Sequence, residues 1–507
     1  MDISEVSTQA HAILAAMQRH QQPIDYQTVI AALHNGDPNW HSRTDAIHLS
    51  SRAFDLLLWV GCVQLQANGY QYELTNYGKT ALNSHWPSAI SSDRLDAWTE
   101  NEMLVEALNQ GRTSSEITVS RLVVKAWRQF RNVDLAFHPS LTIVTGANGA
   151  GKTTLLNMLG PHFSWSGQLL TRRSRSVADT SHEPVGQIYY SNGGRSPLLQ
   201  YAGSPGISAS PLQIPQMEQV PGLFINSHRS ISSYQQLKSL PARFSEWQTL
   251  QQDFASEIWN RYSGNSSQHS PLYRMKEALV AAAMYAYGNS AVRKNESARE
   301  LWEGYQEILR RFLPASLQFS KLVVEDAEIV IVTKNAEFPL EAISGGISAM
   351  FELSWQIFLR QKDQDAFTVC IDEPENHLHP ELQRSIIPSL LTAFPNVTFI
   401  VATHSPHVVT STPESNVYAL HPDGDGSVSS SYITGINATA TSDETLMSVL
   451  GLDSALPIWA SSKMRQLMDK MPASPTASQL RDFRDELNRL GLGRQFPAAV
   501  EALGIQP

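Results

Sequence analysis

Apolar side chains recur at helical spacing through the first part of the chain. The segments AHAILAAMQRH, DYQTVIAALH and HLSSRAFDLLLWVG place them three and four positions apart, which predicts three helices. The next stretch, VQLQANGYQYEL, carries strand-forming residues on both sides of an Ala-Asn-Gly turn and predicts a short hairpin. This part of the sequence therefore predicts a small α+β domain.

The pattern changes to strands at Ile117. The run LTIVTG at 141–146 predicts a buried strand, and TTLLNMLG directly after it has the spacing of a helix. A largely helical stretch follows at 232–315, and strands return from Lys321 in KLVVEDAEIVIVTK, FTVCID and VTFIVAT. Buried strands that alternate with helices predict an α/β fold with a helical insertion.

Composition limits the class of protein. The chain has 507 residues, of which 42% are hydrophobic and 17% charged, as in a globular protein of several domains. No apolar run approaches the roughly 18 residues that cross a bilayer, and acidic residues stand where a signal peptide carries basic ones. Cys62 and Cys370 lie in apolar runs, which indicates buried thiols in a reducing compartment. We expect a cytoplasmic protein with no membrane partner.

Charge argues against broad coating of nucleic acid, because the formal net charge is −10. The order of elements in the first domain resembles a winged-helix domain, and most such domains bind DNA. Residues 1–90, however, carry four basic and seven acidic side chains. Contact with another protein is therefore favoured over DNA binding for this domain.

The segment GANGAGKT joins the strand at 141–146 to the helix that follows. It fits the phosphate-binding pattern GxxxxGK[ST] in the setting that this pattern requires. Glycines let backbone N–H groups surround phosphates, the lysine reaches the β and γ phosphates, and Thr153 ligates Mg²⁺. A chance glycine-rich turn is the weaker alternative. The predicted nucleotide-binding residues of this loop are Gly146, Asn148, Gly149, Gly151, Lys152, Thr153 and Thr154.

Two further segments carry acids or a histidine at the end of a buried strand. FTVCIDEPE ends in Asp372, predicted to hold Mg²⁺, and Glu373, predicted to polarise the attacking water. VTFIVATHSP places His404 at the end of another buried strand.

A fourth segment, ISGGI, opens an apolar helix with Ser344, Gly345 and Gly346, and helix starts bind anions. Ser344 precedes Asp372 by 28 residues. The order of phosphate loop, SGG, acidic strand and histidine resembles the ABC-type ATPases, whose signature motif is LSGGQ. The resemblance implies a P-loop ATPase head that binds ATP and Mg²⁺ and hydrolyses ATP, with His404 as the contact of the γ-phosphate. It also implies that each nucleotide site is completed by the signature serine of a second copy.

Some positions depart from the family pattern. Ile347 stands where the signature usually has glutamine, so the hydrogen bonds of that side chain are lost. The segment that connects the lobes, the Q-loop, has two candidates: Gln187, or the turn LFINSHRS with Ser227, His228 and Arg229. Arg128 and Arg131 are candidates for a basic residue near the nucleotide, and exposed strand arginines are the equal alternative.

These motifs divide the chain into six predicted segments. They are a winged-helix-like domain at 1–95, a linker at 96–116, an ATPase lobe with the phosphate loop at 117–231, a helical insertion at 232–318, a second ATPase lobe with the signature, acidic strand and His404 at 319–440, and a helical tail at 441–507.

The wording DEPENHLHP and THSP is similar to the OLD-like branch of ABC ATPases, which is common in bacterial anti-phage systems. The histidines His377, His379, His404 and His407 could be assembled into a metal site, but HLHP is characteristic of this branch, so a metal is disfavoured. Asp423 and Asp425 suggest Toprim nuclease acids, but Asp-Gly favours a hairpin turn.

Lys152 and Ser344 are 192 residues apart, farther than in transporter subunits, and the helices between them show no SMC-length coiled coil. About a hundred residues follow His404, fewer than an appended Toprim nuclease needs. The sequence resembles the ATPases of Septu, PARIS and retron-linked systems. That resemblance implies a homodimeric sensor or scaffold ATPase that controls a separate nuclease or toxin, with DNA or a phage protein as trigger. The alternative function is a DNA-bound repair ATPase of the RecF or SMC type.

Overall fold

The computed structural model divides into two compact units, residues 1–439 and 440–507. The residues that the structure describes are 3–19, 24–25, 29, 53–54, 56–57, 62–65, 71–83, 117–167, 169–172, 182–201, 209–228, 234–239, 243–265, 267–290, 293–412, 415–423, 426–433, 458–472, 475–490, 492–493, 496 and 499–500.

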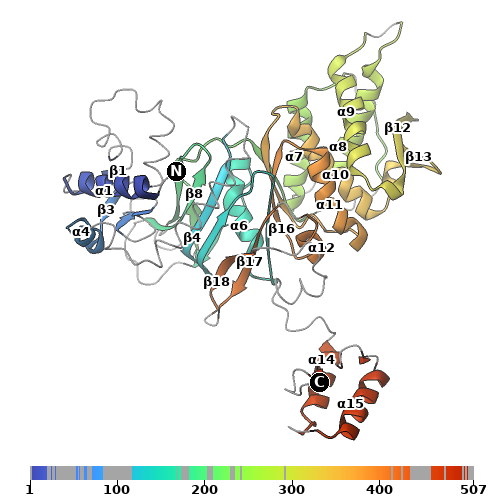
Figure 1. Ribbon diagram of the computed structural model, residues 1–507. Coiled ribbons are helices and arrows are strands. Elements are labelled where there is room, and N and C mark those ends of the chain that lie inside the picture. The colour runs from blue at the N-terminus through green and yellow to red at the C-terminus, as the bar shows by residue number, and fades with distance from the viewer. Residues whose placement is uncertain are drawn as a thin grey trace. The chain divides into compact units, whose positions relative to one another are not determined.

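A twelve-stranded sheet forms the centre of the first unit (Figure 1). Its spatial order is β11-β15-β16-β6-β17-β18-β5-β4-β8-β9-β10-β7. The strands are β4 (Val119–Trp127), β5 (Phe130–Ala136), β6 (Leu141–Gly146), β7 (Leu170–Arg172), β8 (His182–Tyr190), β9 (Arg195–Tyr201), β10 (Ala209–Gln213), β11 (Gly222–Ile225), β15 (Phe367–Asp372), β16 (Val397–Ala402), β17 (Asn416–Pro422) and β18 (Val428–Tyr432).

Strand direction divides this sheet into two parts. Five neighbouring strands run parallel to one another: β11, β15, β16, β6 and β17. Farther along the sheet, β5, β4, β8, β9 and β10 each pair antiparallel with the next strand in this order. Every residue of β6, β15 and β16 is buried, as their predominantly apolar sequences predict. The carboxyl ends of the parallel strands therefore lie at one edge of a buried sheet.

The helix after the phosphate loop packs on this sheet. α6 (Lys152–Leu159) contacts β6, β15 and β16. Its apolar side chains belong to one core with Trp127, Phe130 and Cys370. The predicted fold class, an α/β P-loop ATPase head, is confirmed by this arrangement.

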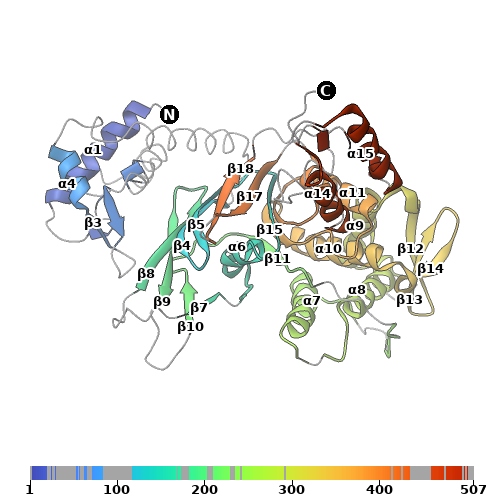
Figure 2. The ribbon, with the colours of Figure 1, turned by 90° about the horizontal axis from the view of Figure 1, so that it is seen from below.

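The helical insertion lies beyond β11, the edge strand of the parallel part (Figure 2). It consists of α7 (Trp247–Tyr262), α8 (Pro271–Ala286) and α9 (Glu296–Phe312), which pack with α10 (Gly345–Gln361). A second sheet, β12 (Phe319–Glu325), β13 (Glu328–Thr333) and β14 (Glu337–Pro339), lies against α8 and α9. The strands and helices expected here are present, except that residues 234–239 and 243–246 are not helical, because Pro241 and the Ser-rich sequence around it oppose a helix start.

Of the predicted winged-helix domain, the structure describes α1 (Ile3–Arg19), α4 (Asn76–Asn83) and a sheet of β1 (Ile24–Asp25), β3 (Gln71–Leu74) and β2 (Val63–Leu65). The antiparallel pairing of β2 with β3 confirms the hairpin. Most residues of the second and third expected helices, and the linker 96–116, lie outside the described residues. The winged-helix topology stays a prediction.

The second unit contains α14 (Ile458–Met468) and α15 (Ala477–Arg489). Thr476 caps α15, and its side chain and that of Gln479 form a reciprocal capping box. A small core of Ala460, Phe483 and Leu487 joins the two helices. Of all the helices that the structure describes, in both units, none is long and apolar enough to cross a membrane.

One buried charge ties the insertion to the segment before α10. Lys276 on α8 has no exposed side-chain surface, and its ammonium group lies 2.8 Å from Glu328 Oε2 on β13 and 2.5 Å from Glu341 Oε1. It also donates to the carbonyl of Gln235. The two carboxylates compensate a charge that would otherwise be costly to bury.

Replacement of Lys276 by alanine is expected to lower the free energy of unfolding by about 3–5 kcal/mol, because two carboxylates then lose their buried partner. Lys294→Ala is the matched control, since Lys294 is 66% exposed in its pair with Glu296, and a loss below about 1 kcal/mol is expected. Urea unfolding followed by tryptophan fluorescence measures both, and equal losses would contradict the assignment.

Candidate functional site

The phosphate loop leaves β6 through glycines with positive φ. Gly146 has φ 145°, Gly149 has φ 81° and Gly151 has φ 99°. A Cβ on Gly146 would lie 2.6 Å from the carbonyl oxygen of Leu420, and one on Gly151 would lie 2.4 Å from the Phe130 ring. These two glycines are therefore required both by conformation and by close neighbours. Around Gly149 no atom lies within 4 Å of such a Cβ, so this part of the loop is open.

Lys152 lies across this loop. Its ammonium group donates to the carbonyl oxygens of Gly146 at 2.9 Å and Ala147 at 3.2 Å, and lies 3.0 Å from His404 Nδ1. Burial lowers the pKa of Lys152 to about 8, although the carboxylates of Glu373 and Asp372 nearby favour the charged form. The Lys152 ammonium group is thus held beside His404, where the parallel strands end.

Thr153 and Asp372 form an oxygen pair at the start of α6. The Thr153 hydroxyl donates to both carboxylate oxygens of Asp372, at 3.1 and 2.9 Å. Asp372 is 2% exposed, whereas Thr153 is exposed. A hydroxyl and a carboxylate beside a phosphate loop are the hard oxygen ligands that Mg²⁺ prefers, so the residues present fit this ion.

Glu373 adopts a strained conformation one residue farther along. Its φ is 49°, and its backbone N–H donates to the Ala402 carbonyl at 2.8 Å. Its carboxylate accepts a hydrogen bond from Asn376 Nδ2 at 2.8 Å and lies 3.6 Å from His404 Nε2. Left-handed φ values of non-glycine residues concentrate at functional sites.

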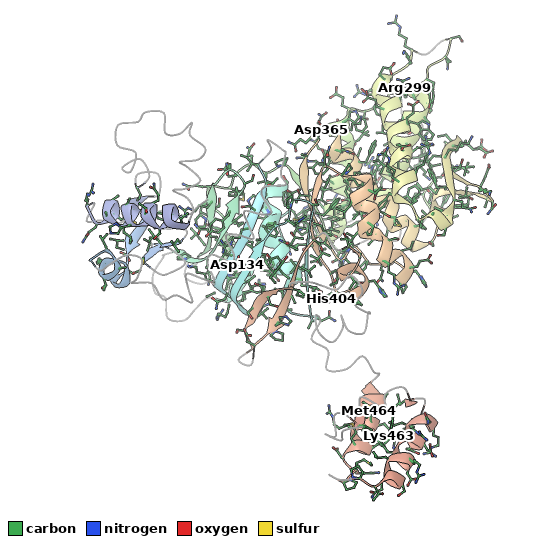
Figure 3. The ribbon with its side chains drawn as sticks, in the orientation of Figure 1. Asp134, Arg299, Asp365, His404, Lys463 and Met464 are labelled. Carbon is green, nitrogen blue, oxygen red and sulfur yellow. The ribbon has the colours of Figure 1, made fainter. Side chains whose placement is uncertain are left out.

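His404 follows the last residues of β16 and is labelled in Figure 3. Burial, and then the adjacent Lys152 ammonium, lower the pKa of His404 below its usual range. Because the ammonium can only donate, Nδ1 accepts from it, and the proton of the neutral ring is assigned to Nε2, on the side of Glu373. The structure thus brings Lys152, Thr153, Asp372, Glu373 and His404 together.

Two residues of this site were not singled out from the sequence. Glu375, the second acid of DEPE, accepts hydrogen bonds from the loop that carries His404. Asn376 Nδ2 donates to Glu373 and also to the carbonyl of Ser227 at 2.9 Å. The charged and amide residues that follow Glu373 in DEPEN were the only sequence signal for them.

Ser344 is the N-cap of α10, and its hydroxyl accepts from Ile347 N–H at 3.4 Å. Ser344 and Gly345 are exposed, whereas Gly346 is buried, and a Cβ there would lie 3.0 Å from the carbonyl oxygen of His377. Within the described part of the chain no hydrogen bond joins the Ser344 side chain to the phosphate loop. The signature segment is thus separate from the Lys152 cluster and packs against the turn after Glu373.

The other three histidines that were considered as metal ligands, His377, His379 and His407, have local roles. His379 is the N-cap of α11 (Pro380–Ala393), and His407 lies in α12 (Pro406–Val409), 3.5 Å from Arg384 Nε. Among the described residues no group of three or more His, Cys, Asp or Glu is arranged to hold a metal. His377, with φ 68°, is exposed in the turn before α11.

The two Q-loop candidates lie in different parts of the sheet. Gln187 belongs to β8, in the antiparallel part, and accepts from Tyr189. Ser227 follows β11, which pairs parallel with β15, and its carbonyl contacts Asn376. The turn after β11 is therefore the candidate that reaches Glu373, while its Arg229 lies outside the described residues.

Three other candidates have structural partners. Arg131 donates to the carbonyls of Arg128 and Phe130 in the β4–β5 turn. Arg128 lies over the Trp127 ring at 4.3 Å. Asp423 follows β17, and its side chain accepts from Ser427 and Ser429 in the predicted hairpin, while Asp425 lies outside the described residues. The pairing of β17 with β18 confirms the hairpin.

Comparison with known proteins identifies relatives of this arrangement. Residues 222–410 match the family "AAA domain, putative AbiEii toxin, Type IV TA system", and residues 121–167 match an AAA domain family. The chain is 23% identical to Septu protein PtuA of Bacillus thuringiensis, over 66% of this chain and 85% of that protein. It is 48% identical to the Retron Ec83 probable ATPase of Escherichia coli over 10% of each chain.

The SMC head domain from Thermotoga maritima is a solved structure with 13% identity and a TM-score of 0.36, over 62% of this chain and 99% of that one. The matched families and the protein relatives confirm the predicted resemblance to Septu and retron ATPases. Two segments of the chain thus match AAA domain families, and the chain is similar to these relatives over the stretches given.

Gly146→Ala is expected to destabilise the head by at least about 1–3 kcal/mol, because the new Cβ meets Leu420 at a φ that side chains rarely adopt. Gly345→Ala is the matched control, since its Cβ meets no atom within 4 Å, and a change within about 0.5 kcal/mol is expected. Urea unfolding measures both, and an unchanged Gly146→Ala protein would refute the steric argument.

Proposed function

We propose that this protein binds ATP with Mg²⁺ and hydrolyses it. The observation that carries the proposal is the convergence of Lys152, Thr153, Asp372, Glu373 and His404 within hydrogen-bonding or ion-pair distance at one sheet edge. Glycine-rich backbone and a helix N-terminus beside a lysine are suited to the phosphates of a nucleotide. Family membership of the matched segments supports the same reaction.

Each residue has a role in this reaction. The backbone of Gly146, Asn148, Gly149 and Gly151, with Thr154, surrounds the phosphates, and Lys152 contacts the β and γ phosphates. Thr153 and Asp372 would hold Mg²⁺, which supplies electrostatic stabilisation of the phosphoryl oxygens. Glu373 orients the attacking water and takes its proton. His404, neutral with its proton on Nε2, donates toward the γ-phosphate.

The site is completed by a second copy of the chain. Ser344 and Gly345 form an exposed helix start, with Gly346 buried next to them, and among the described residues no hydrogen bond joins the serine side chain to the phosphate loop of the same chain. In a head-to-tail dimer this helix start meets the γ-phosphate bound to the partner copy. ATP then joins the two copies, and hydrolysis separates them.

The biological role that we propose is that of a sensor or scaffold ATPase in an anti-phage system, with a separate nuclease or toxin as effector. The similarity to Septu protein PtuA and to a retron ATPase supports this role over the DNA-bound repair function. Nucleotide-dependent assembly would hold or release the effector. The trigger would be DNA or a phage protein.

Lys152→Ala and Ser344→Arg variants are each expected to lose ATP hydrolysis, because each disables both sites of a dimer. An equal mixture forms heterodimers with one intact site, so about a quarter of the wild-type activity should return if copies pair at random. Phosphate release after mixing measures this recovery. An active Ser344→Arg protein, or a mixture without recovery, would contradict the shared site.

Glu373→Gln is expected to slow turnover by at least about a hundredfold and to keep the ATP-bound dimer together, because the base is lost while the contacts of the nucleotide remain.

Expressed with its neighbouring genes, the Glu373→Gln variant should co-purify with a separate effector in an ATP-dependent manner. DNA alone, without the effector, should not stimulate turnover of the wild-type protein. Strong stimulation by DNA that falls steeply with salt would favour the repair function instead.

A further inference from the structure

Glu375 joins the turn after β15 to the loop after β16. Its Oε1 accepts three hydrogen bonds from that loop: from Thr403 Oγ1 at 2.6 Å, His404 N at 2.9 Å and Ser405 N at 3.2 Å. The residue is 9% exposed, and Thr403 and Ser405 are also buried. One buried oxygen therefore fixes the backbone on both sides of His404.

The rest of this loop is held by other contacts. Thr403 N–H donates to Val144 and Thr145 Oγ1 donates to the Thr403 carbonyl, both at 3.1 Å, so the loop is also tied to β6. The Ser405 hydroxyl donates to Gln383 Oε1 at 2.7 Å. These contacts hold residues 403 and 405, whereas among the contacts of the described residues Glu375 supplies the bond to the backbone of His404 itself.

The other side of the connection is the strained turn that carries Glu373. Asn376 N–H donates to the Glu373 carbonyl at 3.1 Å, and its side chain donates to the Glu373 carboxylate. Glu373 and Glu375 thus share one short turn, and only Pro374 separates them. The distance of 3.6 Å between Glu373 Oε1 and His404 Nε2 depends on how firmly this turn and the His404 loop are joined.

We propose that Glu375 is a positioning residue that sets His404 relative to Glu373. It acts through the backbone of His404 and does not touch the nucleotide. This inference rests on the proposed ATPase function and adds a specific dependence: His404 contributes to hydrolysis only while Glu375 Oε1 accepts from its loop. Small displacements of a positioned group have large effects on rate, which makes such a residue measurable.

A double-mutant cycle tests this dependence. Glu375→Ala is expected to lower kcat by about a hundredfold, on the scale of lost positioning, and to change the affinity for a non-hydrolysable ATP analogue by less than about threefold, since no contact of the nucleotide is removed. In the His404→Ala background, Glu375→Ala should cause almost no further loss, because the residue that it positions is absent.

Two variants separate positioning from a general effect on folding. Glu375→Gln keeps an acceptor oxygen, so kcat should stay within about tenfold of wild type. Thr403→Val keeps the side-chain volume and removes one of the three donors, so a partial loss is expected that also vanishes in the His404→Ala background. Thermal unfolding of each variant is compared with wild type.

The outcomes are distinct. A loss from Glu375→Ala or Thr403→Val that persists fully in the His404→Ala background overturns the inference, and so does a Glu375→Gln variant as slow as Glu375→Ala. If Glu375→Ala does not fold, Thr403→Val and Glu375→Gln decide the question in the same cycle. A wild-type protein that does not hydrolyse ATP would instead overturn the proposed function, which the wild-type measurement reveals separately.

Discussion

The parallel pairing of β6, β15 and β16 is the constraint on which the rest of the head depends. The register places Asp372 opposite Ala402, and Ala402 opposite Val144, so β15 and β16 end at the same level and β6 continues two residues farther, to Gly146. Each strand is buried throughout, and the polar side chains inside the strands are threonines, whereas the carboxylate of Asp372 stands at the end of β15. The phosphate loop, the two acids and His404 meet because the carboxyl ends of these parallel strands lie at one edge of the sheet.

Buried charges are placed at the joints between elements. Lys276 joins α8 to β13 and to the segment before Ser344, and Glu375 joins the turn after β15 to the loop after β16. Each has several partners that compensate its burial. Such contacts have directed geometry, whereas apolar packing tolerates small shifts. These two contacts therefore fix the positions of the signature segment and of His404, the two places where the proposed reaction needs a defined geometry.

Much of this could be predicted from sequence because it is local. The strand, glycine loop and helix around Lys152 follow from an apolar run, positive-φ glycines and helical spacing in consecutive residues. The hairpin at β17 and β18 follows from an Asp-Gly turn between two strand patterns. Within the stretch at 232–315, which was predicted to be largely helical, residues 234–239 and 243–246 are not helical, since Pro241 and its polar neighbours oppose a helix start.

By itself, the sequence determined the strand and helix types of the head, the residues of its motifs and the order in which they occur. Only the tertiary structure decided which of the two Q-loop candidates contacts Asn376, the hydrogen-bond partner of Glu373, and that Glu375 holds the His404 loop. The reason is the separation of the partners: Asn376 and Ser227 are 149 positions apart, and Glu375 and Thr403 are 28 apart. No local periodicity encodes contacts across such distances, because they arise when strand register brings the ends of separate strands to one edge.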